Sequence, residues 1–195
     1  MERIAIIRLS SLGDIVHALP VLPALRRNRP QCRVTWFAEP AGAELLGHFP
    51  GIDEIARVDV KGRRSLPAKI AYLVRFAWRW RGRFDLVLDF QGLLKSALIA
   101  FLLGGTRLGF GRGNLREPLA ALLYSRRADP FPEERHVIRK NLHLLSLLGI
   151  EGAEVEYPRR SWRPSEALAA FLKESGLGEG GWIVLNVGGG WPSKL

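Results

Sequence analysis

The regular alternation of short apolar segments with segments of helical periodicity constrains the fold most. Residues 3–9, RIAIIRL, and residues 84–90, FDLVLDF, are aliphatic runs of strand length. The second run leads into GLLKSALIAFLLG at 92–104, which has the composition of a buried helix and stops at a glycine pair. Strands and helices that alternate at this spacing predict βαβ units, and therefore an α/β fold with a parallel sheet covered on both faces.

The same pattern predicts the other elements. Further strands are expected at 32–38, 54–60 and 106–110, and helices at 14–28, 40–48, 66–81, 116–124 and 133–149. Pro20 and Pro23 should kink the first of these helices or shorten it. Because ligands bind outside the carboxyl ends of the strands in such sheets, we expect the loops that follow the strands to form one mouth. These are the loops at 10–14, 39–42, 61–65, 90–95 and 110–116.

The composition changes after residue 150, and this change predicts the domain organisation. Residues 1–155 are expected to form one complete N-terminal domain, followed at 156–180 by a polar, Pro-rich linker and a helix over 165–178. Residues 181–195, GWIVLNVGGGWPSKL, combine a strand with a glycine loop, which is how an α/β domain begins. We therefore expect the first α-β elements of a second, truncated domain.

Cysteine usage and hydropathy indicate the compartment. The single cysteine, Cys32, excludes an intramolecular disulfide framework and fits a reducing compartment. The first residues lack the features of a signal peptide, and no stretch approaches ~18 uninterrupted apolar residues. We expect a cytoplasmic protein without a membrane span.

The basic residues are concentrated in one stretch. The net charge is +10, and between Arg57 and Arg83 nine lysines and arginines are opposed only by Asp59. Such a block predicts a polyanionic partner, which could be nucleic acid, an anionic membrane or a phosphorylated substrate. Within it, the 66–81 helix has aromatic residues among arginines, which suits a membrane interface or single-stranded nucleic acid. A helix half buried against the sheet would account for some of the aromatics but not for the arginines.

The SSLGD segment at 10–14 follows the first predicted strand and has two interpretations. Ser10 or Ser11 can cap the next helix, with Asp14 favoured by the helix dipole, which would lower the pKa of Asp14. Alternatively, Gly13 allows a tight turn and Asp14 faces the mouth of the sheet as a general base, where burial would raise its pKa.

Other polar residues follow the later strands. Asp89, Gln91 and Lys95 come after the 84–90 strand, and Asp89 is interpreted as a helix cap. Arg112 and Arg116 lie together on the next loop, which favours an anion site. His17 lies one helical turn from Asp14 and could reach the same mouth. His136 and His143 are seven residues apart, and we interpret them as marking one solvated or interfacial face.

Two glycine-rich motifs and the histidines exclude further function classes. GFGRGN has Asn114 where a dinucleotide fingerprint needs its third glycine, which argues against a nicotinamide cofactor. GGGWPSK at 188–194 lacks the glycine directly before the lysine of a P-loop, although its backbone N–H groups and Lys194 suit a phosphate. The histidines have no metal-ligand spacing with one another or with Cys32, so no metal is expected.

Five segments together resemble the lipopolysaccharide heptosyltransferases of glycosyltransferase family 9. They are RLSSLGDIVHALPVLPAL, FDLVLDFQGLLKSALIA, GFGRGNLREPLA, HVIRKNLHLLSLLGI and NVGGGWPSKL, and they occur in the family's order from Arg3 to Leu195. The resemblance implies a GT-B fold of two Rossmann-like domains, with the acceptor on the N-terminal domain and the ADP-heptose donor on the C-terminal one. It also implies an inverting transfer of heptose to the Kdo of the lipopolysaccharide inner core, without a cofactor.

The resemblance further implies roles for particular residues. Asp14 would be the base, with Ser11 and Gly13 beside it at the acceptor. The acceptor anions would be held by Lys61, Arg63, Arg64 and Arg116. The donor diphosphate would be held by Gly188, Gly189, Gly190 and Lys194. The implied partners are the nucleotide sugar, Kdo-lipid A and the inner face of the cytoplasmic membrane, with the protein peripheral on that membrane and no nucleic acid bound.

Alternatives remain open at this point. The chain could be a non-catalytic module that binds anionic lipid or lipopolysaccharide through residues 57–83. It could be a family 9 transferase that acts later in the core. A nucleic-acid binder is permitted by the isoelectric point of about 10.6 but lacks any recognisable binding motif. Because most of a donor domain is missing, we expect this chain alone to have little or no transferase activity.

Overall fold

The computed structural model describes residues 1–59, 65–132, 136–159 and 166–176. The chain divides into two compact units, residues 1–160 and residues 161–195. Six strands of the first unit form one sheet in the order β3-β2-β1-β4-β5-β6, and all neighbouring strands are parallel. Their bounds are β1 (Arg3–Ile7), β2 (Arg33–Ala38), β3 (Glu54–Arg57), β4 (Leu86–Asp89), β5 (Thr106–Phe110) and β6 (Arg126–Ala128).

The order of the strands defines a doubly wound sheet. β1 pairs with β2 on one side and with β4 on the other, with Ile6 in register with Trp36 and Leu88. The chain thus reverses its direction of winding between β1 and β4, and in open α/β sheets the ligand binds at such a switch point, at the carboxyl ends of the strands.

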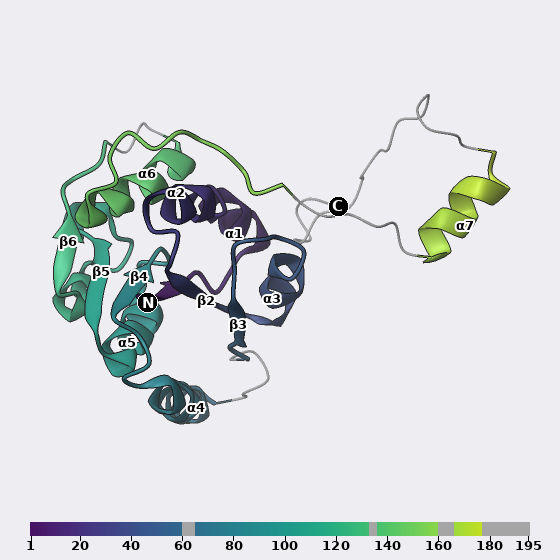
Figure 1. Cartoon of the computed structure of the whole chain (residues 1–195). Helices are drawn as coiled ribbons and strands as arrows, with labels where there is room; N and C mark the ends of the chain where they lie inside the picture. Colours follow the sequence, from purple (N-terminus) through teal and green to yellow (C-terminus); the bar gives the residue numbers. More distant parts are fainter. Residues whose placement is uncertain (60–64, 133–135, 160–165, 177–195) are drawn as a thin grey trace. The chain divides into compact units, whose positions relative to one another are not determined.

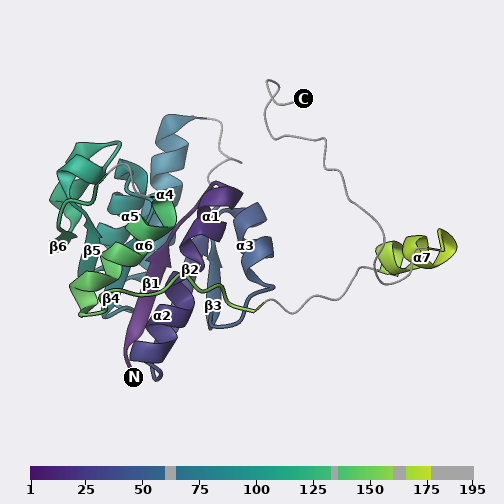
Figure 2. The same ribbon diagram turned by 90° about the horizontal axis from the view of Figure 1, so that it is seen from above.

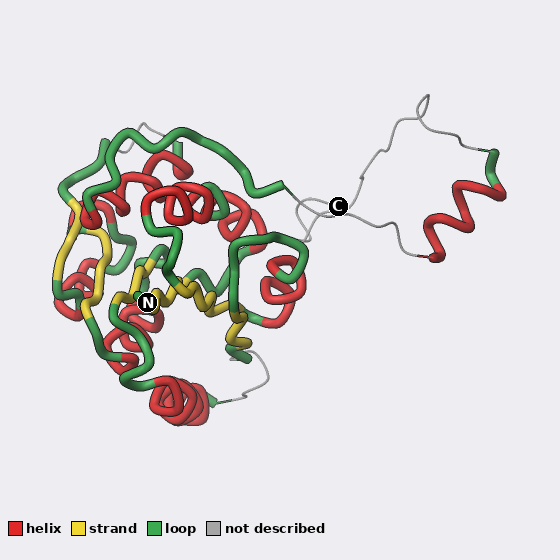
Figure 3. Tube along the Cα trace, in the orientation of Figure 1, coloured by secondary structure: helices red, strands yellow, loops and turns green. Residues whose placement is uncertain are grey.

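Helices cover both faces of this sheet, as Figures 1 and 3 show. Ile4 and Ile6 of β1 belong to the apolar core beneath α1 (Leu12–Ala18), α2 (Val21–Asn28), α3 (Pro40–Leu46) and α6 (Val137–Leu144). Ala5 and Ile7, which alternate with them, belong to the core beneath α4 (Leu66–Trp80) and α5 (Leu94–Leu103). Because successive strand residues point to opposite faces and both faces are covered here, β1 is apolar and buried from Ile4 to Ile7, as expected of a central strand.

The predicted α/β class with a parallel sheet is confirmed, and the differences have local causes. The predicted 14–28 helix is interrupted at Pro20, as expected, and forms α1 and α2. The predicted helix at 116–124 is the 3₁₀ helix η2 (Pro118–Leu123), which follows the short η1 (Arg112–Asn114). The predicted helix at 133–149 begins as α6 after His136 and continues as η3 (Leu145–Leu148). Strand β6 was not predicted, because its three residues include two exposed arginines.

The second unit is described only over α7 (Glu166–Glu174) and the turn that follows it, within the predicted 165–178 helix. The predicted strand and glycine loop at 181–195 lie outside the described residues, and the boundaries predicted at 155 and 180 stay predictions. Among the helices that the structure describes, none has both the length and the apolar character needed to cross a membrane.

Candidate active site

A pocket of about 210 Å³ lies at the switch point of the sheet. Its walls come from the segment after β1, the turn after β4, the loop after β5 and the helix α6, and they include Asp14, Gln91 and Arg116. Figure 2 shows α1 and α6 on the same side of the strands. Three of the loops predicted to meet, at 10–14, 90–95 and 110–116, therefore do so. A larger hollow of about 610 Å³ lies by β6, α6 and η3, and is lined by residues of both charge signs.

Asp14 both caps α1 and faces the pocket. Ser11 is the N-cap residue, and its backbone N–H and its hydroxyl each donate to Asp14 Oδ2 over 3.1 Å. The other oxygen, Oδ1, lies 2.9 Å from Arg8 Nη2. The side chain of Asp14 is still 39% exposed. Asp14 can therefore belong to the cap of α1 and also face the mouth of the sheet, because the hydrogen bonds from Ser11 fix a carboxylate that stays accessible from the pocket.

The partner of Asp14 is an almost buried arginine. The Arg8 residue is only 8% exposed, and its Nη1 donates to the Phe90 carbonyl at the end of β4. Burial lowers the pKa of the Arg8 guanidinium, which the charges of Asp14 and Asp89 partly offset. Sequence reasoning did not select Arg8, although a charged residue directly after a buried apolar strand was a usable signal.

The pKa of Asp14 lies below its ordinary range. Partial burial raises it, but the positive charge of Arg8 and the two hydrogen bonds from Ser11 lower it by more. The lowered pKa is the direction that the capping interpretation predicted. It keeps Asp14 ionised at neutral pH, and an ionised carboxylate is the form that accepts a proton.

Asp89 is a buried acceptor that fixes the turn after β4. Its interpretation as a helix cap is therefore wrong. Asp89 is fully buried, and α5 is instead capped at Leu93. Its Oδ1 accepts from the N–H groups of Gln91 and Gly92 over 2.9 and 3.2 Å, and its Oδ2 accepts from the Tyr124 hydroxyl over 2.8 Å. Burial raises the pKa of Asp89, against the effect of these hydrogen bonds, and burial beside Asp89 raises the pKa of Tyr124.

The side chain of Gln91 connects the two turns of the site. Its Oε1 accepts from the N–H of Leu9 over 2.9 Å and from that of Ser10 over 3.3 Å. Gly92, the next residue, has a φ of +68°, and a Cβ there would lie 2.7 Å from Leu115 Cδ2. The turn after β4 thus positions the SSLGD segment through the side-chain amide of Gln91. The backbone of this turn requires a glycine at position 92.

Gly13 does not make the tight turn that was expected of it. It lies in the first turn of α1 without a positive φ, and a Cβ there would meet nothing within 4 Å. The glycine therefore leaves open space at the exposed start of α1, beside Ser11 and Asp14. That space is compatible with its predicted place at the acceptor, which stays a prediction.

Two cations besides Arg8 reach the pocket, and they come from different elements. Arg116 is exposed and lines it, whereas Arg112 does not. Lys140 of α6, which the sequence did not single out, donates from Nζ to the Asn114 carbonyl over 2.5 Å and lies 4.9 Å from the ring centroid of Phe110. Arg8, Arg116 and Lys140 give the pocket a positive wall beside one carboxylate.

Other predicted residues lie elsewhere. Lys61, Arg63 and Arg64 lie outside the described residues, as do Gly188, Gly189, Gly190 and Lys194. Lys95 Nζ lies 3.8 Å from Oε1 of the buried Glu39, so the start of α5 meets the start of α3, and neither residue lines the pocket. Within the described ranges, no three His, Cys, Asp or Glu residues are grouped so as to hold a metal ion.

The histidines do not behave as predicted. His17 does not line the pocket; its ring packs edge-on against that of His136 at 5.3 Å. His136 accepts from the N–H of Ile138 at the start of α6. His143 instead packs against Phe131, with its Nε2 3.1 Å from the Asp129 carbonyl, so the two α6-region histidines do not share one environment.

A doubly wound α/β domain with a carboxylate and a cationic wall at its switch point has the architecture of a ligand-binding domain, and its positive charges suit an anionic ligand. The family comparison is more specific. Residues 74–175 match the model described as glycosyltransferase family 9 (heptosyltransferase). The chain belongs to glycosyltransferase family 9, as its motifs indicated.

Individual relatives agree with this assignment. Lipopolysaccharide heptosyltransferase 1 of Pseudomonas aeruginosa is 34% identical over 149 residues, which are 74% of this chain and 42% of that protein. The structure of E. coli heptosyltransferase WaaC with ADP superposes with a TM-score of 0.66 at 27% identity, over 82% of this chain and 50% of that one. A family 9 transferase structure from Veillonella parvula has a TM-score of 0.76 at 19% identity, over 91% and 50%, and supports the fold alone.

The chain spans about half the length of these relatives, or somewhat less. Its six-stranded sheet therefore corresponds to one part of a GT-B heptosyltransferase structure.

Proposed function

We propose that this chain is the acceptor-binding part of an inverting glycosyltransferase that moves heptose from ADP-heptose to the Kdo of the lipopolysaccharide inner core. One observation carries the proposal: Asp14 is held ionised by Arg8 and Ser11 at the switch point of the sheet, on the wall of a cationic pocket. The names of the relatives support the sugar and the acceptor class, and a relative's structure with ADP supports the nucleotide.

In the proposed reaction Asp14 acts as the general base. Its carboxylate takes the proton of the acceptor hydroxyl while that oxygen bonds to the anomeric carbon of the heptose. The bond from this carbon to the ADP oxygen breaks, and ADP leaves with the electron pair. Attack from the face opposite the leaving group inverts the anomeric centre without a covalent intermediate. A low pKa keeps the base ionised, and Arg8 keeps it oriented.

Charge recognition divides between the two substrates. We propose that Arg116 of the pocket, together with Lys61, Arg63 and Arg64, binds the carboxylates and phosphates of Kdo-lipid A, with Ser11 and Gly13 beside the reacting hydroxyl. The backbone N–H groups of Gly188, Gly189 and Gly190 would bind the diphosphate of the donor, and Lys194 would neutralise its charge, without a metal or cofactor. A lipid-anchored acceptor would hold the protein peripherally at the inner face of the cytoplasmic membrane.

The test is a transfer assay with the full-length reading frame, ADP-heptose and Kdo-lipid A. Wild type should transfer heptose, Asp14→Asn should lose at least about 100-fold in kcat, and Glu44→Gln on the exposed surface of α3 should match wild type. Equal rates for wild type and Asp14→Asn would contradict the role of Asp14.

The 195-residue chain alone, about half the length of its relatives, should show no turnover. Transfer only to a heptosylated core would indicate heptosyltransferase II or another family 9 member.

A second candidate function rests on the basic stretch around α4. A non-catalytic module for anionic lipid or lipopolysaccharide would bind through residues 57–83, a stretch that contains nine basic residues and one acidic residue. Its binding would survive Asp14→Asn and weaken with salt, because screening acts on exposed charges. Binding without any transfer by the full-length protein would favour this function.

A further inference from the structure

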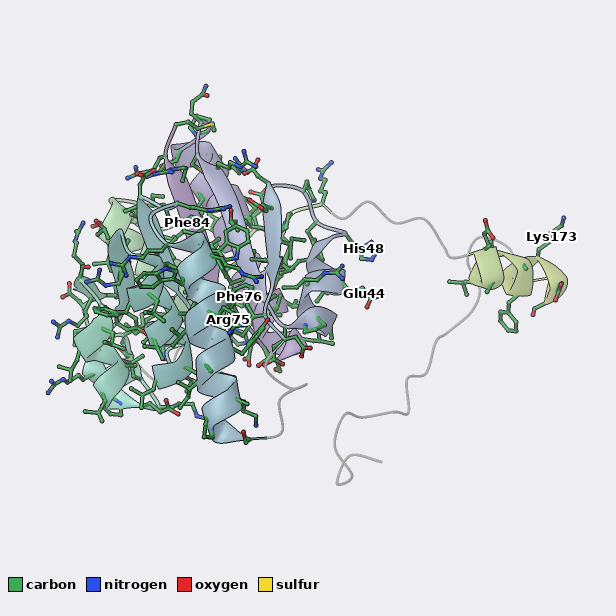
Figure 4. All side chains as sticks on the ribbon, turned by 90° about the horizontal axis from the view of Figure 1, so that it is seen from below. Glu44, His48, Arg75, Phe76, Phe84 and Lys173 are labelled. Carbon is green, nitrogen blue, oxygen red and sulfur yellow. The ribbon has the colours of Figure 1, made fainter. Side chains whose placement is uncertain are left out.

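One layer of the domain exposes an unusual number of large apolar side chains. α4, α5 and η2 cover the same side of the domain, and Figure 4 views it with α4 toward the reader. Ile70, Val74, Trp78, Leu94, Phe101, Leu119 and Leu122 are all exposed on these three elements. Within the described residues, α2, α3 and α6 carry no exposed side chain of this kind. We call the outer surface of α4, α5 and η2 the α4–α5–η2 face.

The apolar residues on the outside of α4 are not part of the core. Leu73 and Ala77 are the buried residues of this helix, and Phe76 and Trp80 pack against Phe37. Ile70, Val74 and Trp78 recur at intervals of four residues and so form a separate stripe on the solvent side. Trp78 is 61% exposed. Core packing does not explain a tryptophan and two aliphatic residues on the outer side of a helix.

Arginines accompany this stripe. Arg75 and Arg79 lie on the outer side of α4, Arg81 lies over the ring of Trp78 at 4.8 Å, and Arg107 lies over Phe101 at 5.5 Å. Neither α4 nor α5 contains an aspartate or a glutamate. Apolar and cationic side chains therefore alternate along the outer side of α4, and Arg107 adds a cation beside α5.

We infer that the α4–α5–η2 face rests on the surface of an anionic lipid bilayer. Exposed aromatic and aliphatic side chains would enter the headgroup boundary, and the arginines would contact lipid phosphates. Because neither α4 nor α5 carries an acidic residue, the charge of these two helices is complementary to the phosphates of an anionic bilayer, and the exposed apolar side chains match its headgroup boundary. The inference deepens the proposed function and rests on its lipid-anchored acceptor.

The face also adjoins the pocket. Leu94 at the start of α5 follows Leu93, which lines the pocket, and its N–H donates to the Glu117 carboxylate over 2.6 Å. Arg116, the residue before Glu117, lines the same pocket. An acceptor embedded in a bilayer under this face would therefore reach the pocket at the N-terminal end of α5.

Co-sedimentation with vesicles tests the inference on the purified chain. Binding to vesicles of phosphatidylglycerol and phosphatidylcholine should exceed binding to pure phosphatidylcholine at least about tenfold and fall with salt. Trp78→Ser with Phe101→Ser should weaken binding about tenfold or more, and Arg75→Gln with Arg79→Gln should reduce the salt dependence. Phe171→Ser, which removes an exposed aromatic from α7, is the matched control and should not change binding. Circular dichroism checks that each variant folds.

Several outcomes would overturn the inference: no preference for anionic vesicles, equal binding by the Trp78/Phe101 variant, or loss of binding in Phe171→Ser. Self-association that Trp78→Ser abolishes in the absence of lipid would instead make the face a protein contact.

Failure of the membrane inference is distinguishable from failure of the proposed function. The full-length Trp78→Ser enzyme should keep its rate on a lipid-free Kdo acceptor even if vesicle binding is lost, whereas vesicle binding without any transfer would contradict the proposed reaction alone.

Discussion

Arg8 Nη2 lies 2.9 Å from Asp14 Oδ1, and the same guanidinium donates to the carbonyl of Phe90. One side chain thus connects the end of β1, the start of α1 and the end of β4. Because Arg8 is almost buried while Asp14 is partly exposed, the arginine acts as a fixed support and the carboxylate as the accessible group.

Removing the support should change the pH dependence of the proposed reaction. In Arg8→Met the charge that lowers the pKa of Asp14 is lost while its partial burial remains, so that pKa should rise. The acidic limb of the kcat profile of the full-length enzyme should therefore move to higher pH. Arg8→Lys, which keeps a charge, should move it less. An unshifted limb in Arg8→Met would contradict the supporting role.

The capping role of Asp14 predicts a pH-dependent contribution to stability. Its folded-state pKa lies below the ordinary value, so the carboxylate stabilises the fold above that value and the contribution disappears as the pH falls through the lowered one. Asp14→Asn should lower the free energy of unfolding by about 1 kcal/mol at pH 7, since solvent screens a partly exposed pair. In urea unfolding of both proteins this difference should be largest at pH 7 and shrink as the pH falls through the lowered pKa of Asp14.

Asp89 should matter for folding more than any other acid of the site. Asp89→Ala leaves the N–H groups of Gln91 and Gly92 and the Tyr124 hydroxyl without their buried acceptor, which should cost about 3–5 kcal/mol. Tyr124→Phe removes one hydrogen bond and should cost about 1–2 kcal/mol. Denaturant titration measures both, and a loss under about 1 kcal/mol in Asp89→Ala would refute the assignment.

Two glycines of the site offer a matched pair. Gly92→Ala forces a side chain into a positive φ and to 2.7 Å from Leu115, and should destabilise the fold by about 1–3 kcal/mol. Gly13→Ala meets open space within a helix and should be neutral or stabilise by up to about 1 kcal/mol. Thermal unfolding compares the two. If Gly13 lies at the acceptor, Gly13→Ala in the full-length enzyme should nevertheless raise the KM for Kdo-lipid A.

Arg116 should act in binding and not in chemistry. Arg116→Ala in the full-length enzyme should raise the KM for the acceptor more than it lowers kcat, as should Arg64→Ala, if each binds substrate and transition state equally. Arg112→Ala, on the same loop but outside the pocket, is the control. A KM unchanged by Arg116→Ala would exclude this residue from acceptor binding.

Periodicity predicted most of the fold because the central strands are apolar on both faces and proline and glycine mark the helix ends. It missed β6, a three-residue edge strand whose two arginines are exposed. Local pattern correctly placed a serine, Ser11, at the N-cap of α1 and Asp14 in its first turn, at the mouth of the sheet. It could not reveal Arg8 as the partner of Asp14, or Asp89 as a buried anchor, because both contacts depend on residues brought together by pairing of β1 with β4. The role expected of Gly13 was wrong because Gly13 lies inside the first turn of α1, after the N-cap residue Ser11, and has no positive φ.

The hydrogen bonds from Leu9 and Ser10 to Gln91 have a consequence for synthesis of the protein. The turn that carries Asp14 is translated among the first fourteen residues, yet the amide that holds it comes about eighty residues later in the chain. During vectorial synthesis β1 can pair with β2 early, but its other edge stays unpaired until β4 leaves the ribosome, and an apolar edge exposed in this way is prone to aggregate. A ribosome that stalls before β4 would therefore release a chain with three of the six strands of this sheet and without the Gln91 side chain that holds the turn after β1.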